Sequence, residues 1–275
     1  MTARSRPEPV AIDDPADPRL APYAAMRERD LVGRAGRFIV EGEVTLRVML
    51  SARARFGLES ILLAPERLPG LETTLARLPE PVPVYTAAKP VMSAITGFPI
   101  HRGVLGVGLR EPEDADATIP DLPPAPAPAL VVGLVGLTNH DNVGGLFRNA
   151  AAFGADAVLL DAGTCDPLYR KAIRVSAGAA LIVPFRQLPD ADALLAFAAH
   201  HALEPLALSP GGAETLAALA PPVRTLLLLG SEGPGLPPDL MTRLRTVRIP
   251  MAPDFDSLNV ATAGAIALHH LSRTA

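Results

Sequence analysis

Two long apolar runs in the second half of the chain limit the folds open to it more than any other feature. The runs LVVGLVGL (130–137) and TLLLLG (225–230) are apolar throughout and do not alternate with polar residues. Strands of this kind are covered on both faces, as in parallel sheets enclosed by helices. Residues 130–275 therefore predict an α/β domain with a parallel sheet covered by helices.

Shorter apolar runs and helical patterns alternate along the same region. The predicted strands are 130–137, 157–160, 181–185, 205–208, 225–230 and 246–250. The predicted helices are 143–153, 170–179, 190–202, 212–219, 237–244 and 259–272. Ligands of parallel sheets bind beyond the carboxyl ends of the strands. The loops after residues 137, 230 and 250 are therefore the first candidates for a functional site.

A segment rich in proline and acidic residues, REPEDADATIPDLPPAPAPA, precedes this region. X-Pro steps hold a chain extended, so residues 111–129 predict a linker. Before it, RFIVEGEVTLRVMLSARARFGLESILLA predicts a strand, a helix and a strand, and VPVYTA and RGVLGVGL predict further strands. We thus expect a small α/β domain with an N-terminal extension at 1–110, followed by the linker and a second domain at 130–275.

The charge is unevenly distributed between these parts. The net charge is −4, but residues 1–110 hold 15 Lys and Arg against 12 Asp and Glu, whereas residues 111–275 hold 10 against 17. The first part is the better candidate for a nucleic-acid partner, although ordinary solvated surfaces also produce a difference of this size.

The chain carries no signal for a metal, a disulfide framework or a membrane. Cys165 is the single cysteine, and no Cys/His pairs have metal-ligand spacing. The N-terminus has no apolar segment of the signal-peptide type, and no apolar stretch reaches the roughly 20 residues of a membrane span. We expect a cytoplasmic protein without metal or membrane association.

The loop after residue 137, TNHDNVGGLFRN, begins a helix. Asn139, Asp141 and Asn142 are good N-caps, and two glycines allow a close backbone approach where free N–H groups favour anions. Arg148 follows six residues after Asn142. This pattern fits an anion or RNA site, and it equally fits a capped helix with a surface charge.

The other two loops are also polar and irregular. In LLLLGSEGPGLPPDL a strand ends in a glycine-rich loop that can present backbone groups to a flat ligand, although it lacks the phosphate-loop lysine and the dinucleotide fingerprint. In VRIPMAPDFDSLNVATAGAIALHHL, Pro250 ends a strand, and Ser257 is a candidate N-cap for a helix of small residues. That helix could pack closely on its own domain or on a partner, and core packing is the simpler interpretation.

In this order and spacing, the three segments resemble the three motifs of the TrmH/SpoU family, the RNA 2'-O-ribose methyltransferases of the SPOUT superfamily. The resemblance covers nearly all of residues 130–272, including CDPLYRKAIRVSAGAA. It implies a parallel α/β domain with a C-terminal trefoil knot, the cofactor S-adenosylmethionine, an RNA substrate (ribosomal or transfer RNA) and a homodimer formed around the last helix. The segments FIVEGEVTLRVML and ITGFPIHRGVLGVG resemble, less specifically, ribosomal-protein-like RNA-binding domains. There His101 and Arg102 fit a polar turn better than a direct RNA contact.

The resemblance also assigns residues. Cofactor contact falls on Leu229, Gly230, Ile249, Met251 and Leu258. The polar positions of the active site fall on Asn142, Arg148, Glu232, Ser257 and Asn259. Glu232 is then expected to fix Asn142 or Arg148, and Ser257 and Asn259 to shape the methyl-transfer pocket. One position departs from the family pattern, because motif three commonly has glycine where this chain has Pro253, which removes a backbone donor there.

The role of Arg148 has two readings. The family's pattern makes it the group that activates the ribose 2'-hydroxyl, yet a guanidinium, with a pKa above about 12, is a poor base at neutral pH. Either the site lowers that pKa, or Arg148 orients an RNA phosphate and stabilises the developing alkoxide while a phosphate oxygen or water takes the proton. We favour the second hypothesis.

Two other classes of function compete with this one. The first is a non-catalytic RNA-binding or ribosome-associated protein that keeps the fold, and the second is a nicotinamide-dependent oxidoreductase, which the missing glycine fingerprint disfavours. Titration with S-adenosylmethionine and with NAD would separate all three. The sequence does not identify the RNA or the nucleotide.

Overall fold

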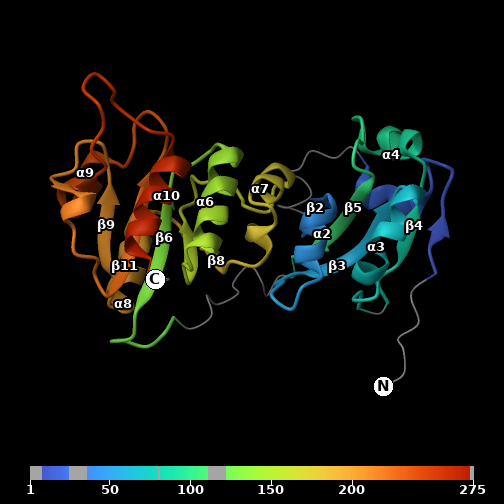
Figure 1. Ribbon diagram of the computed structural model, residues 1–275, viewed down its shortest axis with the longest axis horizontal. Helices are drawn as coiled ribbons and strands as arrows, with labels where there is room; N and C mark the ends of the chain where they lie inside the picture. The colour runs from blue at the N-terminus through green and yellow to red at the C-terminus, as the bar shows by residue number, and fades with distance from the viewer. Residues whose placement is uncertain (1–7, 25–35, 80, 111–121, 273–275) are drawn as a thin grey trace. The chain divides into compact units, whose positions relative to one another are not determined.

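The computed structural model describes residues 8–24, 36–79, 81–110 and 122–272 (Figure 1). The chain divides into two compact units. The first contains the described residues that precede the linker, together with Leu168–Ile182. The second contains the described residues of Asp116–Pro167 and Val183–Ala275. Most of the predicted linker, residues 111–121, lies outside the described residues.

The second unit is built on a seven-stranded sheet in which every strand pair is parallel. The order is β10-β12-β9-β11-β6-β7-β8. The strands are β6 (Ala129–Val135), β7 (Ala157–Leu160), β8 (Phe185–Gln187), β9 (Glu204–Leu208), β10 (Glu214–Thr215), β11 (Arg224–Gly230) and β12 (Arg245–Arg248). All residues of β6 and β11 are buried. The parallel sheet expected from the two apolar runs is confirmed.

Helices cover both faces of this sheet. They are α6 (His140–Ala152), α8 (Ala191–His200), α9 (Pro238–Thr242) and α10 (Val260–Leu271), with a short 3-10 helix, η4, at Leu216–Ala218. On one face, Leu194 of α8 and Leu240 of α9 pack against Val131 and Leu228 in one apolar cluster. On the other face lie α6 and α10 (Figure 1), where Gly264 of α10 lies against Leu229.

Small residues bring α6 and α10 unusually close together. A Cβ added at Gly145 would lie 2.8 Å from Ala261 Cβ, and one at Gly264 would lie 2.4 Å from Leu146 Cδ2. Asn149 Nδ2 donates across the same contact to the Ala261 carbonyl at 2.8 Å. The small residues of 259–272 thus serve core packing within the domain, as the simpler interpretation held.

Two predicted elements of this region are wrong. Residues 212–219 form a two-residue edge strand and a 3-10 turn, not a helix, because Gly212 lies against the β12 backbone, where an added Cβ would be 2.4 Å from Val247 C. The run 181–185 is not a strand. Gly178, with φ +86°, begins a 3-10 turn at Ala179–Leu181 (η3), and pairing with β7 starts only at Phe185.

The first unit holds a five-stranded mixed sheet in the order β1-β4-β3-β5-β2. Its strands are β1 (Val10–Ala11), β2 (Arg37–Glu41), β3 (Gly57–Leu63), β4 (Val84–Thr86) and β5 (Val104–Leu109). Its helices are η1 (Pro18–Tyr23), α2 (Glu43–Met49), η2 (Pro65–Arg67), α3 (Leu68–Leu75), α4 (Lys89–Thr96), α7 (Arg170–Val175) and η3. The four expected strands and the helix after the first of them are confirmed. Among the described helices of the whole chain, none is long and apolar enough to cross a membrane.

One buried arginine fastens the start of β11 to its surroundings. Arg224 is 7% exposed. Its guanidinium donates to the His201 carbonyl from Nε at 3.1 Å and from Nη2 at 2.9 Å. Nη1 donates to the carbonyls of Pro123 and Ala127, which lie in the segment leading into β6. One side chain thus provides hydrogen bonds to three partly buried carbonyls.

We expect Arg224→Met to lower the free energy of unfolding by about 2–4 kcal/mol, because it removes the charged donor of four hydrogen bonds to three partly buried carbonyls. Urea unfolding followed by far-UV circular dichroism measures the change. The control is Arg243→Met, which removes an exposed pair with Asp192 and should cost less than about 1 kcal/mol. Equal losses in the two variants would contradict the role given to Arg224.

Candidate active site

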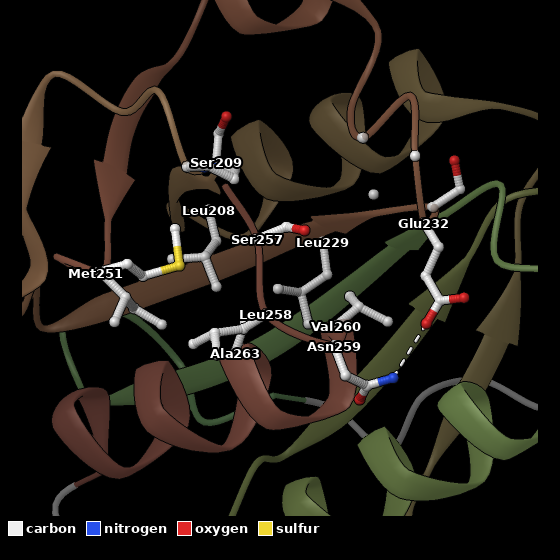
Figure 2. Close-up of a pocket in the computed structure, with 16 residues that line it drawn as sticks. Leu208, Ser209, Leu229, Glu232, Met251, Ser257, Leu258, Asn259, Val260 and Ala263 are labelled. Carbon is white, nitrogen blue, oxygen red and sulfur yellow. Dashed lines mark hydrogen bonds between the residues drawn. The ribbon is translucent and has the colours of Figure 1, made fainter. Parts of the chain in front are cut away.

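Two of the three candidate loops, those after β11 and β12, line one cavity at the carboxyl ends of β9, β11 and β12. The cavity has a volume of about 460 Å³. Figure 2 shows its walls, which come from the loops after these strands and from the first turn of α10. Its lining residues are Leu208, Ser209, Pro210, Leu229, Gly230, Ser231, Glu232, Gly233, Gly235, Ile249, Met251, Ser257, Leu258, Asn259, Val260 and Ala263.

Eight of the ten residues assigned from the sequence lie in this lining. All five assigned to the cofactor are there: Leu229, Gly230, Ile249, Met251 and Leu258. Glu232, Ser257 and Asn259 line it as well. Asn142 lies directly behind the lining, and Arg148 lies further along α6. The structure therefore brings the residues together, and their individual roles remain predictions.

Gly230 gives the loop after β11 its tight path. The loop folds back so that Gly235 N donates to Ser231 O at 3.1 Å. An added Cβ at Gly230 would lie 2.3 Å from both Gly235 C and Leu236 N. These are backbone atoms, so a side chain at this position would displace the loop that carries Ser231 and Glu232 along the cavity wall.

The Asn259 carboxamide joins all three loops. Its Nδ2 donates to Asn142 Oδ1 at 2.8 Å and to Glu232 Oε1 at 3.0 Å, the latter drawn as a dashed line in Figure 2. Its Oδ1 accepts from Ala261 N and Thr262 N, which makes Asn259 the N-cap of α10. The candidate cap Ser257 does not cap this helix, and its Oγ donates to Asp256 Oδ1 at 3.2 Å.

Glu232 was expected to fix Asn142 or Arg148, and this expectation is wrong. The carboxylate contacts Asn259 instead, because Asn142 directs its own carbonyl oxygen toward the same carboxamide. Two acceptors cannot bond each other, and the two N–H groups of Asn259 serve both.

Asn142 and Arg148 differ in exposure along the same helix. Asn142 is 5% exposed, whereas Arg148 is exposed. Asn139 caps this helix by accepting from Asp141 N at 2.8 Å, as one of the three candidates. Within the described part of the chain, the Arg148 guanidinium has no hydrogen bond or ion pair. Its donors are therefore available to a ligand.

Sequence reasoning missed the loop after β9. Leu208, Ser209 and Pro210 complete the cavity wall (Figure 2). The signal was present, since 205–208 was a predicted strand of the same sheet and its carboxyl end must reach the same edge. The loop has no distinctive sequence motif that would mark it as part of a functional site.

Pro253 does not remove a donor from the cavity. Pro253 and Asp254 form an exposed turn, and Asp254 adopts a left-handed conformation with φ +65°. Neither residue belongs to the lining, which skips from Met251 to Ser257. The departure from the motif-three pattern thus changes the path of an outer turn.

The thiol next to the first loop is unsuited to nucleophilic chemistry. Burial, with a smaller contribution from the charge of Asp166, raises the pKa of Cys165 to about 11. The thiol is then protonated at neutral pH, and only a thiolate is a strong nucleophile. No cluster of three or more His, Cys, Asp or Glu side chains among the described residues could hold a metal ion.

The cavity suits the methyl donor that the resemblance implies. Leu229, Ile249 and Leu258 provide apolar walls for a flat ring, and the turn around Gly230 exposes backbone groups beside them. The cavity holds no basic side chain, which fits a ligand without phosphates.

Comparison with known proteins agrees with this geometry. Residues 129–269 match the model of the SpoU rRNA methylase family. An uncharacterized tRNA/rRNA methyltransferase of Mycobacterium bovis is 36% identical over 279 residues, which cover 95% of this chain and 91% of that protein.

Solved structures share the fold over nearly the whole chain. The structure of an RNA 2'-O ribose methyltransferase aligns with a TM-score of 0.76 at 25% identity, covering 95% of this chain and 98% of the other. The SpoU methyltransferase AviRb from Streptomyces viridochromogenes, in complex with AdoMet, aligns with a TM-score of 0.75 at 24% identity, covering 93% and 97%.

The parallel sheet and the cavity at its carboxyl edge match the architecture of RNA methyltransferases, and the relatives place the chain in this class of enzyme. The family match covers more than half of the chain, and the Mycobacterium bovis relative is matched over 91% of its length. The chain belongs to the SpoU rRNA methylase family.

We expect Gly230→Ala to weaken S-adenosylmethionine binding at least about tenfold, because the added Cβ would displace the loop backbone at Gly235 and Leu236. A loss of about 1.4 kcal/mol in binding free energy corresponds to a tenfold weaker affinity. Isothermal titration calorimetry measures the affinity. Gly211→Ala is the control, because an added Cβ there meets nothing within 4 Å. It should change the affinity less than about twofold. Unaltered binding by Gly230→Ala would remove Gly230 from the cofactor wall.

Proposed function

We propose that the chain transfers a methyl group from S-adenosylmethionine to a ribose 2'-hydroxyl of ribosomal or transfer RNA. The observation that carries this proposal is the position of Asn259, which lines the cavity and is hydrogen-bonded both to Glu232 in the cavity wall and to Asn142 of α6, the helix that carries Arg148. The names of the relatives support the same substrate class.

The cavity residues hold and orient the donor. Leu229, Gly230, Ile249, Met251 and Leu258 would hold it through apolar walls and backbone groups. When bound, its sulfonium supplies an activated methyl group with a good leaving group. Alignment of the acceptor oxygen with that methyl group then accounts for much of the rate, and no metal is needed.

Arg148 acts on the RNA side of the site. Its guanidinium offers five N–H donors in a fixed fork, which fits bidentate binding of a phosphate. Held there, it orients the ribose and stabilises the negative charge that develops on the 2'-oxygen, while a phosphate oxygen or water accepts the hydroxyl proton.

The other polar residues keep the site in shape. Asn259 fixes the loop carrying Glu232 against α6 through Asn142, and α6 is the helix that carries Arg148. Ser257, exposed at the rim, lies where it can contact the ribose.

The test uses purified protein, labelled S-adenosylmethionine and total RNA from a strain lacking the gene. We expect label in RNA, at a ribose that resists alkaline cleavage. Arg148→Lys should reduce turnover at least about tenfold and Arg148→Ala about 10²–10³-fold, because a point charge lacks the bidentate geometry.

Two comparisons make this test specific. Arg243→Lys, an exposed arginine of the same unit, should leave turnover unchanged. Near-normal turnover by Arg148→Lys would argue against a bidentate role. S-adenosylmethionine binding without any methyl transfer to RNA would favour the non-catalytic RNA-binding alternative.

We assign RNA binding to residues 1–110 and methyl transfer to residues 130–275, joined by the linker at 111–129, and we expect the protein to work in the cytoplasm. Two observations support this division. The first unit has its own sheet and apolar core, and residues 1–110 have a net positive charge whereas residues 111–275 have a net negative charge. The trefoil knot remains an expectation from the fold family.

We further propose a homodimer formed around α10. Phe255 is 64% exposed and Ile266 is 41% exposed, although both are large and apolar. Ile266 lies on the face of α10 turned away from α6, one turn from the exposed Thr262. A dimer interface that included α10 and the loop before it would cover both of these exposed apolar side chains.

The double variant Phe255→Asp/Ile266→Asp should be monomeric, because two charges would be buried at the proposed interface. Light scattering after gel filtration measures the mass. Val223→Asp is the control, since Val223 is 55% exposed at the start of β11 and should keep the dimer. A monomeric unaltered protein would refute the dimer outright.

A further inference from the structure

Cationic side chains from five segments gather at one edge of the sheet in the first unit. This edge holds the carboxyl ends of β2, β3 and β4 and the start of the antiparallel β5. The side chains are Arg47 of α2, Arg67 of η2, Lys89 of α4, Arg102 before β5, and Arg170 and Arg174 of α7. We call these six residues the cationic edge.

Three of them crowd over a pair of neighbouring glycines. A Cβ added at Gly42 would lie 3.3 Å from Arg102 Nη1. A Cβ added at Gly103 would lie 3.4 Å from Lys89 Cε and 3.5 Å from Arg67 Cγ. The two glycines are adjacent across the sheet, since Gly42 N donates to Val104 O at 2.9 Å.

Helix α7 adds two more cations to the same place. Arg170 Nη1 and Arg174 Nη1 lie 3.6 and 3.9 Å from Glu41 Oε2, at the end of β2. The Arg170 guanidinium also stacks over the Phe98 ring, 4.0 Å from its centroid. Stacking fixes the plane of a guanidinium and leaves its edge able to donate hydrogen bonds.

Among the described residues, ion pairs at this edge join five of the six cations to three carboxylates. Glu41 faces Arg170 and Arg174, Glu43 faces Arg47 and Arg67, and Glu66 faces Lys89. Within the part of the chain that the structure describes, six cations therefore face three carboxylates, in a chain whose net charge is −4.

Arg102 has no partner at all within the part of the chain that the structure describes. Arg102 is exposed, and its Nη1 lies beside Gly42, the residue that follows Glu41. Like charges held this close repel one another, so an anionic partner would stabilise the arrangement.

We propose that the cationic edge binds the phosphate backbone of the RNA substrate, with Arg102 and α7 as part of the surface. The inference rests on the proposed function, which supplies RNA as the polyanion. It replaces the earlier interpretation of His101 and Arg102 as a simple polar turn. It also gives a role to Leu168–Ile182, a segment that packs with the first unit although it lies between strands of the second in sequence.

The experiment measures how RNA affinity depends on salt in the full-length protein. The probe is a fluorescein-labelled RNA hairpin of 30 nucleotides, titrated by anisotropy at several KCl concentrations. Each lost phosphate contact should reduce the slope of log K against log salt by about 0.7–0.9. We expect Arg102→Ala to weaken binding about three- to tenfold, and Arg102→Ala/Arg174→Ala to weaken it further and lower the slope by nearly twice as much.

Arg77→Ala is the matched control. Arg77 is an exposed arginine just after α3, which runs from this edge back toward the opposite end of the sheet. It should keep both affinity and slope. S-adenosylmethionine affinity, measured by calorimetry, should stay unchanged in all variants, which shows that they are folded.

The outcomes separate this inference from the proposed function. Unaltered protein that neither binds nor methylates RNA would refute the proposed function. A second outcome is that the unaltered protein methylates RNA while both variants keep full RNA affinity and an unchanged salt slope. That result would refute RNA binding by the cationic edge and would favour an acidic protein as its partner. A raised KM for RNA with kcat retained would support it.

Discussion

The site depends on one carboxamide whose hydrogen-bonding capacity is fully used. Asn259 gives one N–H to Asn142 on α6 and one to Glu232 after β11, and its oxygen caps α10 through two backbone N–H groups. A carboxylate at this position could cap the helix but could not donate, and it would meet Glu232 as a like charge. An amide in this orientation therefore joins its own loop to two others. Asn142 precedes Asn259 by 117 residues along the chain, and Glu232 precedes it by 27.

The parallel sheet makes that junction possible. Because β6, β9, β11 and β12 all run in the same direction, the loops that follow them emerge at one edge. The close contact of α6 with α10 through Gly145 and Gly264 then sets the distance at which Asn142 and Asn259 meet. A larger side chain at either glycine would push the helices apart and stretch the 2.8 Å hydrogen bond between the two asparagines.

The sequence reveals those parts of this arrangement that leave a local signal. Strands buried on both faces appear as unbroken apolar runs, which is why β6 and β11 were predictable. The run at Leu181–Val183 is equally apolar, but it follows Gly178 and begins at the last residue of the 3-10 helix Ala179–Leu181, and periodicity does not distinguish this outcome from a strand. The loops of the site followed from the sheet rule and the family motifs. The partner of Glu232 did not, because it depends on which way the amides of Asn142 and Asn259 point in space.

Asn259 is fixed by hydrogen bonds, whereas Arg148 is exposed, and this difference bears on how RNA binding is linked to methyl transfer. The cavity wall is held by hydrogen bonds and close backbone packing before any ligand arrives, whereas the described residues leave the Arg148 side chain without a partner. Ordering a free arginine costs about 2 kcal/mol of side-chain entropy. If an RNA phosphate supplies the partner, binding energy from the substrate offsets that cost, and the guanidinium is fixed only when a ribose is in place. If Arg148 is ordered in this way, methyl transfer to bound RNA is favoured over transfer to water.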